Sequence, residues 1–477
     1  MLEVQFGIVL FIVSFICLVG WLVTTKNHNV FKLRGIAYIK PTLFFGNFYS
    51  ALFELEHQEK LILSIYNYFK TEKVFGIYNF LRPTIIVKDL NLAKQITIDY
   101  HDNFRDRDFY EIDHVLNKSL FNQRGENRKR MRNLMINYFS NENFKSFHND
   151  QNILNSESLK EHLNEEDNAA IKNNSIMLHF HIFLVNMYCD IIFGSKSPKN
   201  EDKVFLLKIM KQVEHDMTSL SGKTKIIFLT YFPRISKLFH IKLINSSAYE
   251  SFKYYSNNEM NYTCDKDKIG LLDFILKNKE SSSNEHDEII LQVFAFFIDG
   301  FFLTSKLFQA CCYELGINES IQVELRKSFI CFEQYRDSKL LHFFILETLR
   351  KWPLINNINR VCNQNCTVET KNGEKLKFYS GDFIKVPIIH MNNDYKYFPD
   401  PLAFDIDRYC KRNEPILSFG FGSRSCFCMD FALDHIKIVL FKTIQNYKIS
   451  IVSDAYDYTA QFSDLKIDII LNSLPNN

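Results

Sequence analysis

FGFGSRSCFCMDFA, from Phe419 to Ala432 of this 477-residue sequence, is the strongest indication of how the chain folds. Cys426 stands two residues after Arg424 and four after Gly422. A thiol ionises more readily beside a positive charge, and a glycine can adopt the positive φ of a tight turn whose N–H groups point at the sulfur. Phe419 would shield that sulfur from water, and burial and hydrogen bonding both tune a metal centre. The stretch therefore predicts a loop that presents a thiolate to iron.

The C-x-C pair is also compatible with two less specific roles. Both cysteines could be buried and chemically idle. A structural zinc site would need four Cys or His ligands in short-spaced pairs, and the nearest further candidates are Cys410 and His435. Zinc is the weaker of these two roles, and a second, distant group of residues decides in favour of iron.

That second group combines a carboxylate with two arginines. Glu347 and Arg350 lie three residues apart in ETLRKWP, so they share one face of a helix, and Arg408 follows in FPDPLAFDIDRY. A glutamate between two arginines has most of its lone pairs satisfied, as a buried charge requires. E-x-x-R alone is common on helix surfaces, but the three residues in this order before the cysteine loop are highly specific.

Together these motifs resemble the cytochrome P450 family. Its cysteine loop, F-x-x-G-x-R-x-C-x-G, is matched at Phe419, Gly422, Arg424 and Cys426, while Cys428 stands where the last glycine is expected. The family also joins its E-x-x-R helix to an arginine from a later segment. The resemblance implies a haem b cofactor whose iron is ligated by Cys426, with Glu–Arg–Arg as the structural core around the loop.

The resemblance implies a mainly α fold with a minor β region, a single P450-type haem-binding fold. Apolar periodicity agrees, because it predicts helices over 205–219 and 431–447 and strands over 84–87, 384–389 and 467–471. No linker or repeat divides the chain, so one catalytic domain over 49–477 is expected. The net charge of +2 argues against a nucleic-acid partner, and 11 scattered cysteines suit a reducing compartment.

The N-terminus predicts a membrane anchor. Residues 4–23 carry no charge over about 20 positions, enough to cross a bilayer, and we expect a retained transmembrane helix within 1–24. Lys26, Lys32 and Arg34 follow, which favours the cytoplasmic side for the bulk of the chain. Residues 25–48 would link anchor and domain, and RGIAYIKPTLFFGNF within them, like DYHDNFRDR further on, resembles the microsomal, insect-like group that handles foreign compounds. Localisation at the endoplasmic reticulum membrane follows from that resemblance.

Residues 285–316 are apolar almost all round, which predicts a buried central helix roughly 45 Å long. By resemblance this helix passes over the haem. Oxygen-activating members carry there a small residue and a glycine, followed by an acid and an alcohol that deliver protons. This sequence reads DGFFLTS, so Phe302 takes the acid position and Leu303 the alcohol position.

Two residues are candidates to replace that pair as catalytic groups. Asp299 lies one turn before Phe302 on the same side of the helix, and a carboxyl group in an apolar pocket has a raised pKa, so it could supply protons. Otherwise a one-residue bulge, of a kind that recurs at functional sites, could bring Thr304 into the alcohol position. Asp299 could equally be a helix acid that is satisfied by a backbone or arginine partner.

A basic cluster, RGENRKRMR, ends at Arg132. Most of its charges are expected on a solvated helix face. In the family this helix carries W-x-x-x-R, which holds the haem propionates; Arg132 matches the arginine and Arg128 replaces the tryptophan. By the same resemblance Arg360 and Arg424 are further propionate ligands, since guanidinium meets carboxylate with paired hydrogen bonds.

The resemblance implies a monooxygenase that inserts one oxygen atom from O2 into a lipophilic small molecule. Electrons would come from NADPH through NADPH-cytochrome P450 reductase, with cytochrome b5 as a second candidate donor. The expected substrate contacts are Ile298, Phe301, Phe302, Leu354, Ile355 and Ile358. Two further functions stay open: a haem-thiolate isomerase or dehydratase, which needs neither proton relay nor reductase, and a haem-binding protein without turnover.

Overall fold

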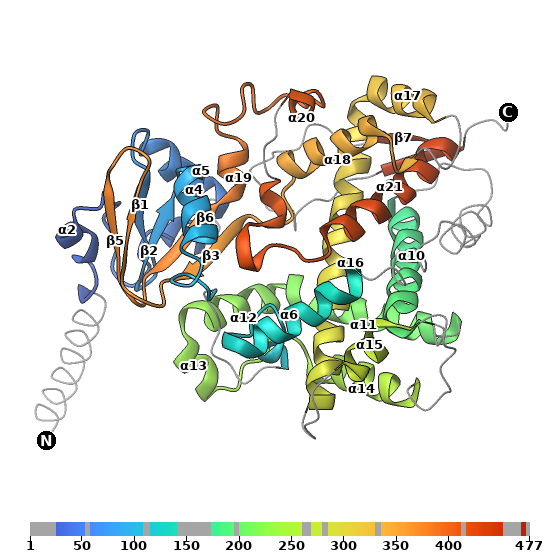
Figure 1. Ribbon diagram of the computed structural model, residues 1–477, viewed down its shortest axis with the longest axis horizontal. Coiled ribbons are helices and arrows are strands. Elements are labelled where there is room, and N and C mark those ends of the chain that lie inside the picture. The colour runs from blue at the N-terminus through green and yellow to red at the C-terminus, as the bar shows by residue number, and fades with distance from the viewer. Residues whose placement is uncertain are drawn as a thin grey trace, which may run out of the picture.

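A long apolar helix, α16 (Glu285–Ile317), runs through the centre of the computed structural model, as Figure 1 shows in yellow. Its extent agrees with the helix predicted over 285–316. By length and composition His286–Ile317 could cross a membrane, but 72% of its most apolar window is buried inside the protein, so it is a core helix. The structure describes residues 25–52, 58–107, 115–140, 173–194, 200–259, 269–278, 285–329, 335–411, 416–451 and 469–473. The predicted anchor, 1–24, lies outside them.

The remaining helices precede and follow α16 in the chain. Before it come α2 (Val30–Arg34), α3 (Tyr49–Leu52), α4 (Gln58–Tyr68), α5 (Leu90–Lys94), α6 (Gly125–Ser140), α10 (Asn173–Phe193), α11 (Asn200–Thr218), α12 (Leu220–Tyr231), α13 (Pro233–Leu238), α14 (Ser246–Glu259) and α15 (Leu271–Lys277). After it come α17 (Glu319–Ser328), α18 (Lys339–Lys351), α19 (Ile388–Asn392), α20 (Arg408–Lys411) and α21 (Met429–Asn446). Short helical turns are the π-helical η1 (Gln95–Asp99) and the 3-10 turns η2 (Val115–Lys118), η4 (Leu417–Phe419) and η5 (Gly422–Arg424).

Within the described residues, the strands form one larger sheet and two smaller pairs. The four-stranded sheet has the order β1 (Val74–Asn79), β2 (Arg82–Val87), β6 (Phe383–Pro387), β3 (Asn357–Val361). Strand β2 pairs with β6 in parallel, and the other neighbours in this sheet are antiparallel. The two smaller sheets are β4 (Cys366–Glu369) with β5 (Lys375–Phe378), and β7 (Tyr447–Ile451) with β8 (Ile469–Ser473).

The mainly α fold with a minor β region is as predicted, and α11, α21, β2 and β8 coincide with predicted segments to within a few residues. One prediction is wrong in part. The strand expected over 384–389 ends at Pro387, and Ile388 begins α19. Proline has no N–H to continue a sheet, so the apolar run is divided between a strand and a helix.

Two hydrophobic cores lie on either side of the cysteine loop. The helical core contains residues of α10, α16, α18 and α21, and the sheet core contains those of β1, β2, β6 and α4. Figure 1 shows the sheet and the main group of helices at opposite sides of the molecule. Leu417 and Phe421 are buried in the sheet core, whereas Phe419 is buried in the helical core. Alternate side chains of the loop thus anchor it to both cores.

Candidate functional site

The loop that carries Cys426 is held by glycine geometry and by its own backbone. Gly422 has φ +65°, and a Cβ there would lie 2.0 Å from the carbonyl oxygen of Thr97 in η1. Only glycine fits this contact. The N–H of Cys426 donates to the carbonyl oxygen of Phe419 at 2.9 Å, which closes the loop around the thiol.

The two thiols of the loop interact directly. Cys426 Sγ lies 3.7 Å from Cys428 Sγ. A hydrogen bond from the Cys428 thiol lowers the pKa of Cys426 against the opposing effect of burial, and the positive charge of Arg132 adds to the lowering. The same hydrogen bond raises the pKa of Cys428. Cys426 is therefore the thiol of this pair that ionises first, as an axial ligand must.

A zinc site at this pair has no support in the described part of the chain. There, no group of three or more His, Cys, Asp and Glu side chains is placed to hold a metal ion. The Nδ1 atom of His435 lies 2.7 Å from the carbonyl oxygen of Phe431, one turn earlier in α21.

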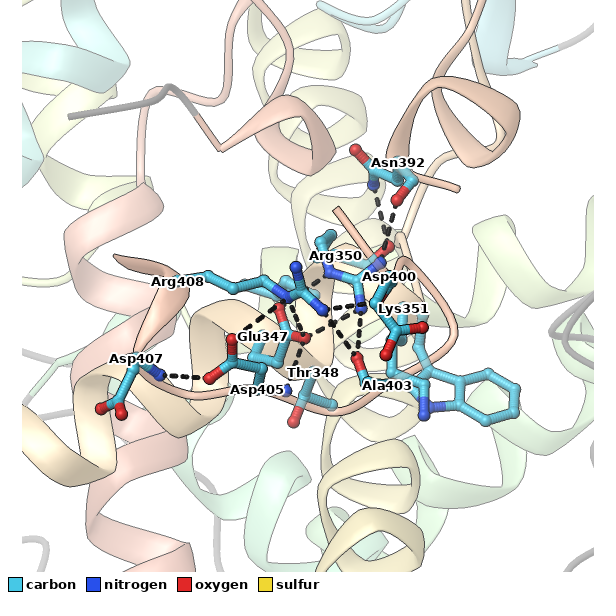
Figure 2. Close-up of polar contacts among 12 residues, drawn as sticks. Glu347, Thr348, Arg350, Lys351, Asn392, Asp400, Ala403, Asp405, Asp407 and Arg408 are labelled. Carbon is cyan, nitrogen blue, oxygen red and sulfur yellow. Dashed lines mark hydrogen bonds and ion pairs between the residues drawn. The ribbon is translucent and has the colours of Figure 1, made fainter. Parts of the chain in front are cut away.

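Glu347 and its two arginines come together as the sequence predicts (Figure 2). Arg350 donates from Nε and Nη2 to the two carboxylate oxygens of Glu347, both at 2.8 Å. Glu347 Oε1 also accepts a hydrogen bond from Arg408 Nε at 3.2 Å and one from the backbone N–H of Asp405 at 3.0 Å. The carboxylate thus receives four hydrogen bonds in a site that excludes water, which offsets its desolvation.

This triad is connected to the cysteine loop through backbone contacts. Arg350 Nη1 donates to the carbonyl oxygen of Asn392 at 2.9 Å, and Asn392 returns a bond to the Arg350 carbonyl at 2.9 Å. Ser418, in the turn η4, donates its hydroxyl to the carbonyl oxygen of Leu349 at 2.7 Å. The end of α18 therefore fixes both α19 and the start of the cysteine loop.

A backbone bridge brings two arginines to the same place from distant segments. Asp106 pairs with Val361, so Arg107 lies opposite Arg360. Burial first, and then the positive charge of nearby arginines, lower the pKa of both Arg107 and Arg360 to about 9. Such a cluster of buried guanidinium groups is stable only with anions beside it. In the sequence Arg107 stands out only as part of a family-like segment, DYHDNFRDR, which gives no sign of its place in the site.

Two other arginines of the site, Arg424 and Arg128, are engaged by backbone carbonyls, whereas Arg132 makes one longer hydrogen bond. Arg424 donates to the carbonyl oxygens of Arg105, Leu120, Phe121 and Gln123. These bonds use most of its five N–H groups. Arg128 donates to the carbonyl oxygen of Ser423 at 3.0 Å, and Arg132 donates to the Ser425 hydroxyl at 3.4 Å. Arg424 and Arg128 thus stabilise the cysteine loop. Arg107 and Arg360 make fewer hydrogen bonds to the protein.

These residues fit a haem. Its iron needs a thiolate, and Cys426 has a lowered pKa. Its two propionates need buried cations, and Nη1 of Arg107 is buried without a hydrogen-bond partner. The residues that would hold the group are Cys426 for the iron and Arg107, Arg132 and Arg360 for the carboxylates.

Asp299 belongs to the same electrostatic neighbourhood. It interacts with Arg107 and with Cys426. Burial raises the pKa of Asp299 to about 6, and the positive charge of Arg107 partly offsets this. The side chain is nevertheless exposed. Both findings hold if Asp299 lines a space enclosed by protein, which is where the haem and its ligands would lie.

Thr304 lies elsewhere. It is buried, and its hydroxyl is 3.2 Å from the hydroxyl of Tyr188 in α10. Gly300, one turn earlier, faces the same tyrosine, because a Cβ there would lie 2.4 Å from that oxygen. The bulge considered for this segment is not present, since α16 is α-helical from Glu285 to Ile317. No local signal in the sequence pointed to Tyr188, which is 116 positions away from Thr304.

Two of the expected substrate contacts lie in the helical core. Ile298 and Phe301 are buried there. The ring centroid of Phe301 is 5.0 Å from that of His181 in α10. Because each residue turns the helix by about 100°, Phe301 lies about 200° round α16 from Asp299 and on its opposite side. The structure therefore does not bring these two residues together.

The other four expected contacts are divided between the two cores. Phe302 and Leu354 are half-buried against the helical core. Ile355 is half-buried against the sheet core, in which Ile358 is buried. Two of these four residues thus pack with the helical core and two with the sheet core.

The fold and the cysteine loop define a haem-thiolate protein, and comparison with known proteins agrees. The family model for cytochrome P450 matches residues 40–466, and the chain belongs to this family. Among similar proteins, cytochrome P450 6j1 of Blattella germanica is 25% identical over 93% of this chain and 91% of its own length. Cytochrome P450 9e2 of the same species is 27% identical over 93% and 92%, and probable cytochrome P450 9f2 of Drosophila melanogaster is 25% identical over 89% and 90%. The family implies a cysteine-ligated haem and monooxygenase chemistry.

Proposed function

We propose that this protein inserts one oxygen atom from O2 into a lipophilic small molecule, with electrons delivered from NADPH by NADPH-cytochrome P450 reductase. The observation that carries the proposal is a loop thiol, Cys426, with a lowered pKa beside buried arginines. The predicted anchor and the positive residues after it favour the cytoplasmic side of the endoplasmic reticulum membrane as the enzyme's location. Cytochrome b5 is a second candidate electron donor.

Each residue of the site has a role in this proposal. The haem supplies the centre at which dioxygen is activated. Cys426 ligates its iron and donates electron density, while Arg107, Arg132 and Arg360 bind its carboxylates. Glu347 and its partners keep the loop in shape, so that the thiol stays at one position.

Asp299 is the proposed proton donor. With a pKa of about 6, it exchanges a proton readily near neutral pH, which an ordinary aspartate does poorly. Arg107 lies close enough to stabilise the carboxylate after the proton has left. Phe302 and Leu303 stand at the positions where the family resemblance predicts an acid and an alcohol, so neither can donate a proton.

The first test is the absorption difference spectrum of the reduced, carbon monoxide-bound protein. Wild type should show the long-wavelength band of a thiolate ligand, and Cys426→Ala should lose it, whereas Cys312→Ala, a buried thiol in α16, should keep it. Oxidation of lipophilic compounds that requires both NADPH and added reductase would then establish the reaction. A wild-type band typical of thiol or histidine ligation would refute the assignment of Cys426.

A second candidate function is favoured by the position of Thr304. Since its hydroxyl is engaged by Tyr188, Asp299 is the one of the two candidate residues that is left to deliver protons. A haem-thiolate isomerase or dehydratase, acting on an already oxygenated substrate, would need no such delivery and no reductase. Consumption of a lipid hydroperoxide without reductase, unchanged in Asp299→Asn, would support this candidate over the monooxygenase.

A further inference from the structure

Cys428 lies at the junction between the cysteine loop and the helix α21. It follows Cys426 by two residues and stands immediately before α21, as the N-cap of that helix. Its backbone has φ −120° and ψ 34°. Its carbonyl oxygen accepts a hydrogen bond from the N–H of Ala432 at 3.0 Å, the first of the helix. The backbone of Cys428 therefore starts the helix without any contribution from the thiol.

The thiol is directed to Cys426 instead. Helix N-caps usually use their side chain to accept a backbone N–H, but the Cys428 side chain makes no such bond. Its sulfur lies 3.7 Å from the sulfur of Cys426, within reach of an S–H···S hydrogen bond. Arg132, a cationic neighbour of the loop, donates to the Ser425 hydroxyl at 3.4 Å.

We propose that the Cys428 thiol donates a hydrogen bond to the Cys426 thiolate in the haem-bound protein and thereby sets how strongly that sulfur donates electrons to the iron. Cys428 is then a positioning and tuning residue, which acts on the iron only through Cys426. The inference rests on the proposed ligation of haem by Cys426.

The physical consequence is a change in reduction potential. A hydrogen bond to a charged acceptor is stronger than one to a neutral group. The sulfur carries more negative charge when the iron is reduced than when it is oxidised, so the donor stabilises the reduced form more. Hydrogen bonds to ligating sulfurs and the surrounding burial are known means of tuning such centres. The thiol should therefore raise the reduction potential.

The test uses three variants of the full-length, haem-loaded protein. Cys428→Ala removes the donor with little change in size, and Cys428→Ser keeps a donor. Cys428→Gly restores the residue expected in the family's loop and removes the donor without adding bulk. None of the three needs a new backbone conformation, because φ at this position is negative. Haem content and the carbon monoxide difference spectrum confirm that each variant is folded and ligated.

The measurements are the reduction potential of the iron and the C–O stretching frequency of the carbon monoxide complex. For Cys428→Ala and Cys428→Gly we expect the ratio of reduced to oxidised iron, at a fixed applied potential, to fall about tenfold, which is about 59 mV for a one-electron couple. The C–O stretch should also fall, because a more strongly donating sulfur increases back-donation to carbon monoxide. Cys428→Ser should lie close to wild type in both.

Two results would overturn the inference. If all three variants match wild type, the thiol does not reach the ligand. If all three shift together, the shape of the loop matters and the hydrogen bond does not. The proposed function fails in a different way, through a wild-type protein that binds no haem or lacks the thiolate-type band, and that result would remove this inference as well.

Discussion

Replacing Arg350 with leucine should strongly destabilise the cysteine loop. The guanidinium group of Arg350 belongs to an ion pair with Glu347 from which water is excluded. The side chains of Arg350 and Glu347 are both 0% exposed. Leucine would remove two bonds to Glu347 and one each to the carbonyl oxygens of Asn392 and Ala403. The buried carboxylate would then keep one guanidinium partner, that of Arg408.

Removing one partner of a buried ion pair typically destabilises a protein by about 3–5 kcal/mol. Arg34→Leu is the matched control. Arg34 also makes two bonds to a carboxylate, that of Asp382, at 2.8 and 2.7 Å, but these side chains are 14% and 16% exposed. A pair that water can reach contributes about 1 kcal/mol or less. The difference between the variants, about 2–5 kcal/mol, isolates the effect of burial.

The assay follows the thiolate-type band of the carbon monoxide complex during urea denaturation, together with the yield of haem-loaded protein. Arg350→Leu should lose most of that yield, because about 3–5 kcal/mol is a large share of the roughly 5–15 kcal/mol by which proteins are stable. Arg34→Leu should keep it. If the two variants denature at the same urea concentration and retain haem equally, the buried triad does not support the loop.

Three further predictions concern the site itself. The pKa of Asp299 is raised from 3.8 to about 6 by folding, so the stability it contributes is present below about pH 4 and lost as pH rises through about 6. Relative to Asp299→Asn, the wild-type melting temperature should fall across that window; parallel pH profiles would contradict this. Gly422→Ala should abolish haem binding through its clash with the backbone, whereas Gly373→Ala, with φ +79° and open space around it, should bind haem normally. Arg107→Gln should speed transfer of haem to an acceptor protein about tenfold or more, since hydrogen bonds to charged groups contribute about 1.5–3 kcal/mol; Arg124→Gln, on an exposed side chain, is the control, and equal transfer rates would count against a propionate contact at Arg107.

The parts of the site that the sequence predicts are those with a local signal. The cysteine loop, the Glu347–Arg350 pair and the long apolar helix each lie within one continuous segment, and spacing alone indicates their shape. The contact of Arg107 with Arg360 depends on a bridge between Asp106 and Val361, which no spacing encodes. Thr304 likewise turns to Tyr188 because the helix stays regular and the two helices pack closely at Gly300. Apolar periodicity indicated that α16 is buried but not which partner each face meets.

The parallel pairing of β2 with β6 has a consequence for biosynthesis. Thr84 pairs with Phe383, so one edge of β2 stays unpaired until a strand that is synthesised 299 residues later has left the ribosome. At typical rates of synthesis this delay is about 15–60 s. During that time the apolar residues of β2, all buried in the finished protein from Thr84 to Val87, present an unpaired strand edge that other chains can join. The risk of aggregation through this edge is therefore greater for the nascent chain than for the completed protein.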